Sequence, residues 1–146
     1  MTKPLLVLDT NIVLDMLHFD DAMTRPLREA LEAGRVRCVV TDATLDEWRR
    51  VLAYPEFALR PAQQAALFAR YQALSVKADA VDADAGLPRC SDPDDQKFIE
   101  LAAASGAQGL VSKDRAVLKL RRRCAPRFRI MTPAEAVQWL DESLPK

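Results

Sequence analysis

The stretch Leu5-Leu6-Val7-Leu8-Asp9-Thr10-Asn11 decides what fold the chain is expected to adopt. Four consecutive apolar residues are typical of a short strand that is buried on both faces. Asp9 follows this run directly, at the carboxyl end of the expected strand. Open α/β sheets bind their ligands outside the carboxyl ends of their strands. The stretch therefore predicts a buried strand that delivers a carboxylate to a ligand site.

Short apolar strands and amphipathic helices alternate along the rest of the chain. Further strands are expected at residues 36–41, 76–81, 109–111 and 128–131, and helices at residues 11–19, 20–33, 43–52, 60–74, 93–105, 114–121 and 132–140. Strands that alternate with helices form a mainly parallel sheet covered on both faces. The fold prediction is an α/β protein, a three-layer α/β/α sandwich around a sheet of four or five strands. A length of 146 residues suits a single domain over residues 1–146.

Composition narrows the class of protein further. A hydrophobic content of 49% and a charged content of 29% are ordinary for a globular protein, which argues against a disordered or membrane-spanning chain. Asp9 interrupts the first apolar run before it reaches the length of a signal peptide, so the expected location is the cytoplasm. The three cysteines, Cys38, Cys90 and Cys124, form no Cys-x-x-Cys pair, and reduced thiols are expected rather than a zinc site or disulfides.

Charge is balanced overall but unevenly distributed. The net charge is +0, yet acids gather between residues 79 and 100 and bases between residues 113 and 129. Such asymmetry indicates one region that holds cations and another that contacts polyanions.

Acidic residues stand where expected strands end or expected helices begin. These are Asp9, Glu47, Asp95 with its neighbours Asp92 and Asp94, and Asp114. Each alone has a structural interpretation: Asp9, Asp92 and Asp114 are good helix caps, and Thr44-x-x-Glu47 has the spacing of a capping box. Together they would repel one another unless a cation lay between them. Oxygen ligands favour Mg²⁺ or Mn²⁺. Because the chain has a single histidine, His18, a hydrolase built here would use metal-activated water rather than a Ser-His-Asp triad.

Four segments in this order resemble the PIN-domain family. They are Asp9-Thr10-Asn11, Glu47 within Leu45-Asp46-Glu47-Trp48, Asp95 within the segment 92–98, and Ser112-Lys113-Asp114. The segments 92–98 and 130–135 are similar to those of the VapC-like ribonucleases that serve as toxins of toxin–antitoxin pairs.

The resemblance implies a Mg²⁺- or Mn²⁺-dependent endoribonuclease with one or two ions. It implies that Asp9, Glu47, Asp95 and Asp114 are catalytic and bind metal, with Asp92 as a further ligand. Asn11 and Ser112 would support them. The products would carry a 5′ phosphate and a 3′ hydroxyl. The implied partners are an RNA substrate, a cognate antitoxin and a second copy in a homodimer, with no membrane.

The basic run has two interpretations. Its residues could steer an RNA backbone, or they could form a solvated helix face. The residues concerned are Lys113, Arg115, Lys119, Arg121, Arg122 and Arg123, with Arg49 and Arg50 beside Glu47 as further candidates.

Three alternatives remain at this point. A haloacid-dehalogenase-type phosphatase would use Asp9 as its nucleophile, but that family has a second Asp where this chain has Asn11. A response-regulator receiver domain would need a phosphoacceptor Asp after a central strand, which Thr41-Asp42 supplies poorly. A catalytically inactive PIN-fold module would bind RNA or protein, and metal-dependent RNA cleavage would distinguish it from the enzyme.

Overall fold

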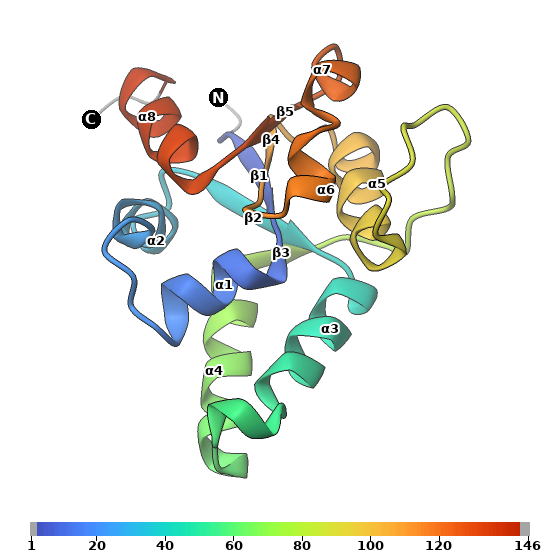
Figure 1. The fold of residues 1–146 in the computed structure, drawn as a ribbon. Helices are drawn as coiled ribbons and strands as arrows, with labels where there is room; N and C mark the ends of the chain where they lie inside the picture. Colours follow the sequence, from blue (N-terminus) through green and yellow to red (C-terminus); the bar gives the residue numbers. More distant parts are fainter. Residues whose placement is uncertain (1–2, 144–146) are drawn as a thin grey trace.

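A five-stranded parallel sheet with the order β3-β2-β1-β4-β5 forms the centre of the computed structural model, which describes residues 3–143 (Figure 1). Every neighbouring pair of strands is parallel. The strands are β1 (Leu5–Leu8), β2 (Arg37–Val40), β3 (Ser75–Lys77), β4 (Gly109–Val111) and β5 (Arg129–Met131). The predicted parallel sheet is confirmed, with the first apolar run as its central strand.

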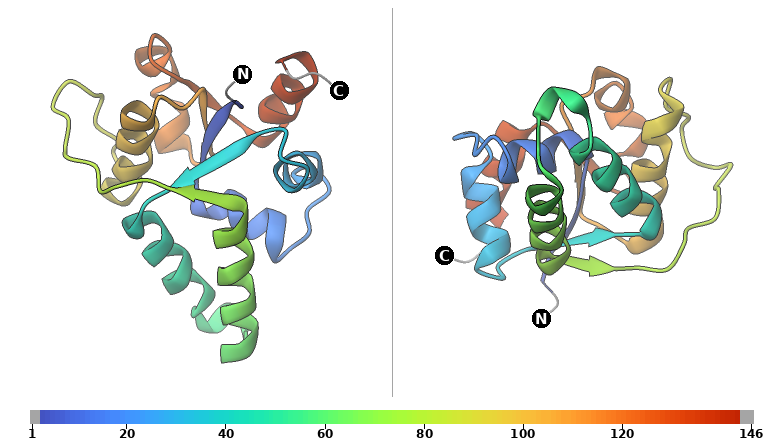
Figure 2. Two further views of the ribbon diagram at one scale, coloured as in Figure 1. Left: turned by 180° about the vertical axis from the view of Figure 1, so that it is seen from behind. Right: turned by 90° about the horizontal axis from the view of Figure 1, so that it is seen from below.

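Helices follow each strand and cover both faces of the sheet (Figures 1 and 2). They are α1 (Thr10–Leu17), α2 (Arg25–Glu32), α3 (Asp42–Leu52), η1 (Pro55–Phe57), α4 (Pro61–Leu74), η2 (Pro93–Asp95), α5 (Gln96–Ser105), α6 (Arg115–Leu118), α7 (Arg121–Cys124) and α8 (Pro133–Ser143). Among residues 3–143, no helix combines the length and the apolar character needed to cross a bilayer.

Alternate residues of β1, β2, β4 and β5 belong to two separate cores, as the period of two in a strand requires. Leu6 and Leu8 of β1 pack in the core that contains α1, α2, α3, α4 and α8. Val7 packs on the opposite face, in the core that contains α5, α6 and α7. The three-layer α/β/α prediction is therefore confirmed.

The order of the strands reverses beside β1. The chain moves outward from β1 to β2 and β3, and then returns to place β4 on the other side of β1. Ligands bind at such a reversal, because the connections leave a crevice at the carboxyl ends of the two strands. Asp9 follows β1 and Ser112 follows β4, so both lie at this crevice.

Two glycines have conformational or packing roles that other residues fill poorly. Gly106 is the C-cap of α5 and has a φ of +67°, a left-handed conformation that glycine adopts without strain. A Cβ at Gly109 in β4 would lie 2.4 Å from Met131 Cε and 3.3 Å from Leu6 Cδ2. The absence of a side chain at Gly109 therefore lets β4 fit closely beside β1 and β5.

Several predicted boundaries are wrong. The helix expected from residue 20 begins only at Arg25, because Asp20 has a φ of +49° and breaks the helical path. The helix expected at residues 114–121 is two short helices, α6 and α7, with a turn that buries Leu120 between them. The strand expected at residues 76–81 covers only Ser75–Lys77 at the edge of the sheet.

The cysteines behave as predicted. Cys38, Cys90 and Cys124 are free and buried, and burial raises the pKa of each thiol. None of these thiols belongs to the acidic cluster described below.

Candidate active site

Asp9 and Ser112 join the carboxyl ends of β1 and β4. The backbone N–H of Asp9 donates to Val111 O over 3.0 Å, which continues the pairing of the two strands. Ser112 Oγ donates to Asp9 Oδ2 over 2.7 Å, and both side chains are buried. Asp9 Oδ1 also accepts from Asn11 N over 3.3 Å, so Asp9 caps α1 as well. The Asp9 carboxylate therefore caps α1 with one oxygen and bonds to Ser112 at the ends of β1 and β4 with the other.

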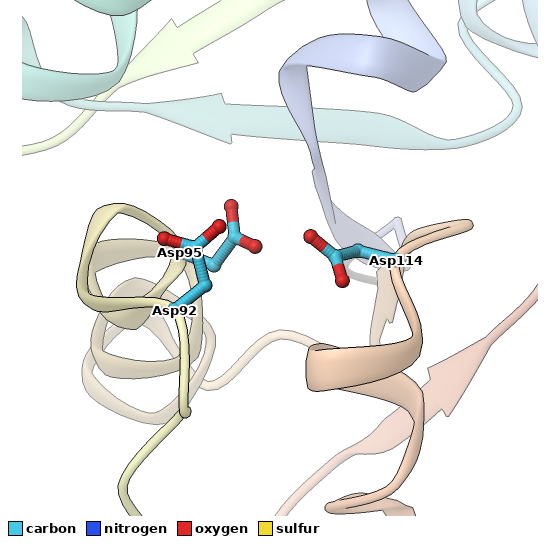
Figure 3. Close-up of side chains that lie close together, drawn as sticks. All are labelled: Asp92, Asp95 and Asp114. Atoms are coloured by element: carbon cyan, nitrogen blue, oxygen red, sulfur yellow. The ribbon is translucent and has the colours of Figure 1, made fainter.

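Asp92, Asp95 and Asp114 bring carboxylate oxygens within 4.8 Å of one another (Figure 3). Asp92 caps η2 through Asp94 N at 3.0 Å, and Asp114 caps α6 through Ala116 N at 2.8 Å. Asp95 makes no capping bond. In Figure 3, Asp114 points from the start of α6 toward the two aspartates of η2. The acids therefore meet across the crevice rather than serving three separate helices alone.

Asp95 is buried without enough hydrogen-bond partners for its carboxylate among the described residues. It is only 8% exposed, and its Oδ2 has no hydrogen-bond partner among residues 3–143. An orphaned buried carboxylate oxygen is costly, and its presence in a native fold calls for a partner such as an ion. A cluster of carboxylate oxygens at this separation fits a hard divalent cation.

The pKa values of the clustered acids are shifted by burial and by their mutual interactions. Burial, the adjacent Asp114 and the charge of Asp9 raise the pKa of Asp95 to about 8. The pKa of Asp114 is lowered, because the Asp95 carboxyl and the Ala116 amide hydrogen-bond to its carboxylate. Burial also raises the pKa of Asp9, although its bond from Ser112 opposes this. The cluster thus favours a proton, or another cation, in its centre.

Glu47 lies at the same cavity but does not make the capping box predicted with Thr44. The helix α3 starts one turn earlier, at Asp42, and the reciprocal bonds join Thr41 and Thr44 instead, at 3.0 and 3.3 Å. Glu47 Oε2 accepts from Thr10 Oγ1, and its Oε1 accepts from Lys97 Nζ at 2.6 Å. This correction strengthens the site, because the Glu47 carboxylate is turned toward the cavity.

Thr10 and Lys97 were not among the predicted site residues. Lys97 also donates to the carbonyl oxygen of Asp94, and its side chain is only 25% exposed. Their positions offered a signal: Thr10 directly follows Asp9, and Lys97 follows Asp95 by two residues in the first turn of α5.

One cavity of about 560 Å³ collects most of the predicted site. It is lined by Asp9, Thr10, Asn11, Leu14, Glu47, Arg50, Val51, Tyr54, Glu56, Phe57, Asp92, Asp94, Asp95 and Asp114. Ser112 is fully buried behind Asp9. Carboxylates predicted from four separate segments of the sequence therefore face a single space.

The predicted basic residues lie elsewhere. Lys113 pairs with the buried Asp15 at 2.6 Å, and Arg121 makes two hydrogen bonds to Glu135 at 3.1 and 3.0 Å. Arg115, Lys119, Arg122 and Arg123 form no ion pair within residues 3–143 and do not line the cavity. That these residues bind RNA stays a prediction.

The two arginines of α3 take different positions. The Arg49 guanidinium lies over the Phe68 ring, 4.3 Å from its centroid, on the α4 side of the helix. Arg50 lines the acidic cavity. Arg50 therefore has the better position to contact a phosphate.

A parallel α/β/α fold whose acids converge where the strand order reverses defines a class of protein with a cluster of carboxylates at the sheet edge. The chain belongs to the PIN-domain family, because its residues 5–116 match the family model described as PIN domain. A search of curated protein sequences gives no match.

The fold also resembles that of a solved structure. This is VapBC2 from Rickettsia felis bound to a DNA fragment from their promoter, with a TM-score of 0.59 and 14% sequence identity. The similarity covers 88% of this chain and 98% of that one. At this identity the likeness supports the fold. Membership of the PIN-domain family favours the nuclease prediction over the phosphatase and receiver-domain alternatives.

Proposed function

We propose that the protein is a Mg²⁺- or Mn²⁺-dependent endoribonuclease and the toxin of a type II toxin–antitoxin pair. The observation that carries the enzymatic part is the convergence of carboxylates on one cavity, with the buried Asp95 Oδ2 left without a hydrogen-bond partner. The proposed catalytic and metal-binding residues are Asp9, Glu47, Asp95 and Asp114, with Asp92 as an additional ligand. Their oxygen donors suit a hard ion, and the described cluster contains no thiolate or imidazole.

A bound divalent ion would lower the pKa of a coordinated water and offset charge on the phosphate that is attacked. The chain's own residues would position the reacting groups. Ser112 fixes the orientation of Asp9, and Thr10 fixes that of Glu47. Arg50 would contact a phosphate oxygen of the substrate, and Asn11 would contact water or phosphate at the mouth of the cavity.

Electrostatics makes the ion a precondition for binding RNA. The cavity is lined by Asp9, Glu47, Glu56, Asp92, Asp94, Asp95 and Asp114, and Arg50 is the cationic residue in its lining. A polyanion would be repelled by such a surface unless bound cations offset its charge. We therefore expect both RNA affinity and catalysis to depend on the divalent ion.

The toxin role rests on the sequence resemblance and on the fold shared with VapBC2. It implies a small antitoxin that binds this chain, together with a second copy of the chain in a dimer. Co-purification with the product of a neighbouring short reading frame, and relief of growth arrest by it, would test this part separately from the chemistry.

The chemical part is tested with purified protein and single-stranded RNA in Mg²⁺ or Mn²⁺. We expect cleavage that a chelator abolishes, that Asp9→Asn abolishes, and that leaves 5′ phosphate and 3′ hydroxyl ends. Asp46→Asn is the matched control, because Asp46 is an exposed acid of α3 outside the cavity. Equal cleavage by wild type and Asp9→Asn would refute the site assignment, and absence of metal-dependent cleavage would leave a binding module.

A further inference from the structure

Four aromatic rings, those of His18, Phe19, Tyr54 and Phe57, gather where α1 and α3 end, and two of them are exposed to solvent. Phe19 is 54% exposed and Tyr54 is 46% exposed. The His18 and Phe19 rings lie 5.6 and 6.0 Å from the Phe57 ring, and the Tyr54 ring lies 6.3 Å from it. Exposed apolar groups that cluster in this way mark contact sites for another molecule.

This aromatic cluster is continuous with the acidic cavity. Tyr54 and Phe57 line the same cavity of about 560 Å³ as the carboxylates. Glu47 and Arg50 are three residues apart on one side of α3, and Tyr54 follows the last residue of this helix, Leu52, by two residues. All three line the cavity, so a ligand that extends from Glu47 to Tyr54 meets a wall that includes Arg50.

The Tyr54 and Phe57 rings form a stacked pair. Their planes differ by 13°, so the two rings present nearly parallel faces. Phe57 N donates to Tyr54 O over 3.1 Å within the turn of η1, which starts with Pro55. Phe57 is also packed against the main core. A preorganised aromatic face loses little conformational entropy when a flat ligand stacks on it.

We propose that Tyr54, backed by Phe57, stacks an unpaired base of the RNA substrate beside the phosphodiester that is cleaved. This inference rests on the proposed ribonuclease function. A planar nucleobase can stack on the Tyr54 ring. Arg50 lines the same cavity as this ring and the carboxylates, where it can contact the phosphate next to the stacked base. Bases within a duplex are unavailable for stacking on protein. The pair therefore selects single-stranded RNA and sets which nucleotide flanks the cut.

The experiment first maps the cut in a short single-stranded oligoribonucleotide incubated with wild-type protein and Mn²⁺. The oligonucleotide is then made again with an abasic nucleotide at each position flanking the cut. The value of kcat/KM is measured on the intact and abasic strands, and on the intact strand annealed to its complement. The variants are Tyr54→Leu, which removes the ring, and Tyr54→Phe, which keeps it. Met23→Ala is the control, because Met23 is 51% exposed and does not line the cavity.

On the intact strand, we expect Tyr54→Leu to lower kcat/KM by roughly 5- to 150-fold, the range given by loss of one base–aromatic stack. Tyr54→Phe and Met23→Ala should leave it nearly unchanged. At one flanking position the abasic strand should be a poor substrate for wild type, and Tyr54→Leu should cause no further loss on it. Annealing to the complement should strongly reduce cleavage.

Other outcomes overturn the inference. If wild type cleaves RNA but Tyr54→Leu has no effect, or has the same effect on every abasic strand as on the intact one, Tyr54 does not stack a base. An aromatic surface needed only for binding a protein partner would give this result. If wild type fails to cleave RNA with any divalent ion, the proposed function itself fails, and the inference falls with it.

Discussion

Ser112 Oγ lies 2.7 Å from Asp9 Oδ2, although the two residues are 103 positions apart in the chain. The bond is possible because β1 and β4 are parallel neighbours and both residues come directly after their strands. Ser112 Oγ also accepts from Asp114 N at 3.0 Å. One buried hydroxyl therefore links two of the proposed metal ligands and fixes the distance between the segments that carry them.

Ser112→Ala should weaken Mn²⁺ binding by about 10- to 100-fold, the usual effect of removing a hydrogen bond that orients a metal ligand. Isothermal titration calorimetry measures the affinity, and urea denaturation checks that the variant folds. Ser105→Ala is the control, since Ser105 Oγ donates to Leu101 O at the far end of α5. Unchanged Mn²⁺ affinity in Ser112→Ala would show that Ser112 does not orient Asp9.

Without metal, the free energy of unfolding should decrease as the pH rises from about 5 to about 8. Asp95 keeps its proton up to a pKa of about 8 in the folded protein, whereas an unfolded aspartate loses it near pH 4. The folded state then binds more protons across this window, so a single group lowers stability by at most about 1.4 kcal/mol per pH unit. The raised pKa of Asp9 acts in the same direction.

Asp114 contributes nothing in that window, because its lowered pKa leaves it ionised in both the folded and unfolded states. Urea denaturation in chelator, repeated at several pH values, measures the slope. Asp95→Asn should flatten it, and saturating Mn²⁺ should reverse it, because metal binding improves as the ligands lose protons. A wild-type slope that Asp95→Asn does not change would contradict the account.

Lys97→Met should tighten Mn²⁺ binding. The Lys97 ammonium lies 2.6 Å from Glu47 Oε1 and competes with a metal ion for negative charge in the cavity. Removing the ammonium leaves the Glu47 carboxylate without its cationic partner. A divalent ion then no longer competes with Lys97 for the negative charge of Glu47, and its affinity increases. Calorimetry with Mn²⁺ gives the affinity, and Arg89→Met is the control because Arg89 pairs with Glu100 outside the cavity. Weaker binding in Lys97→Met would indicate that Lys97 organises the ligands instead.

Arg122→Ala and Arg121→Ala should have different effects, although the residues are adjacent. Arg122 forms no ion pair in the described part of the chain, and its loss should lower the slope of log K against log salt by about 0.7 if it contacts a phosphate of single-stranded RNA. Arg121 is paired with Glu135, so its loss should mainly reduce stability. RNA binding titrations at several salt concentrations show whether Arg122 contacts an RNA phosphate or belongs to a solvated helix face. An unchanged slope in Arg122→Ala supports the solvated face.

The positions of the acids could be predicted from the sequence because they follow from strand ends. The apolar run before Asp9 and the short run before Ser112 mark strands, and parallel strands present their carboxyl ends at one edge. Helix signals placed Asp92 and Asp95 correctly at the start of α5, where η2 leads into the helix.

The partners of these acids could not be predicted in the same way. Glu47 bonds to Thr10 and Lys97 across 37 and 50 residues, and only the packing of three helices brings them together. Local spacing instead suggested a capping box formed by Thr44 and Glu47, but α3 starts at Asp42 and its capping box joins Thr41 and Thr44. The pairing of Arg121 with Glu135 could not be predicted for a similar reason, because it depends on how α7 meets α8.

The most direct test of the central claim locates the ion itself. A crystal of the protein grown with Mn²⁺ is measured near the manganese absorption edge, and an anomalous difference map is calculated. We expect a peak in the cavity bounded by Asp9, Asp95 and Asp114, which disappears in Asp95→Asn crystals grown under the same conditions. A peak at another acidic group, or a folded wild-type crystal with no peak in this cavity at saturating Mn²⁺, would contradict it.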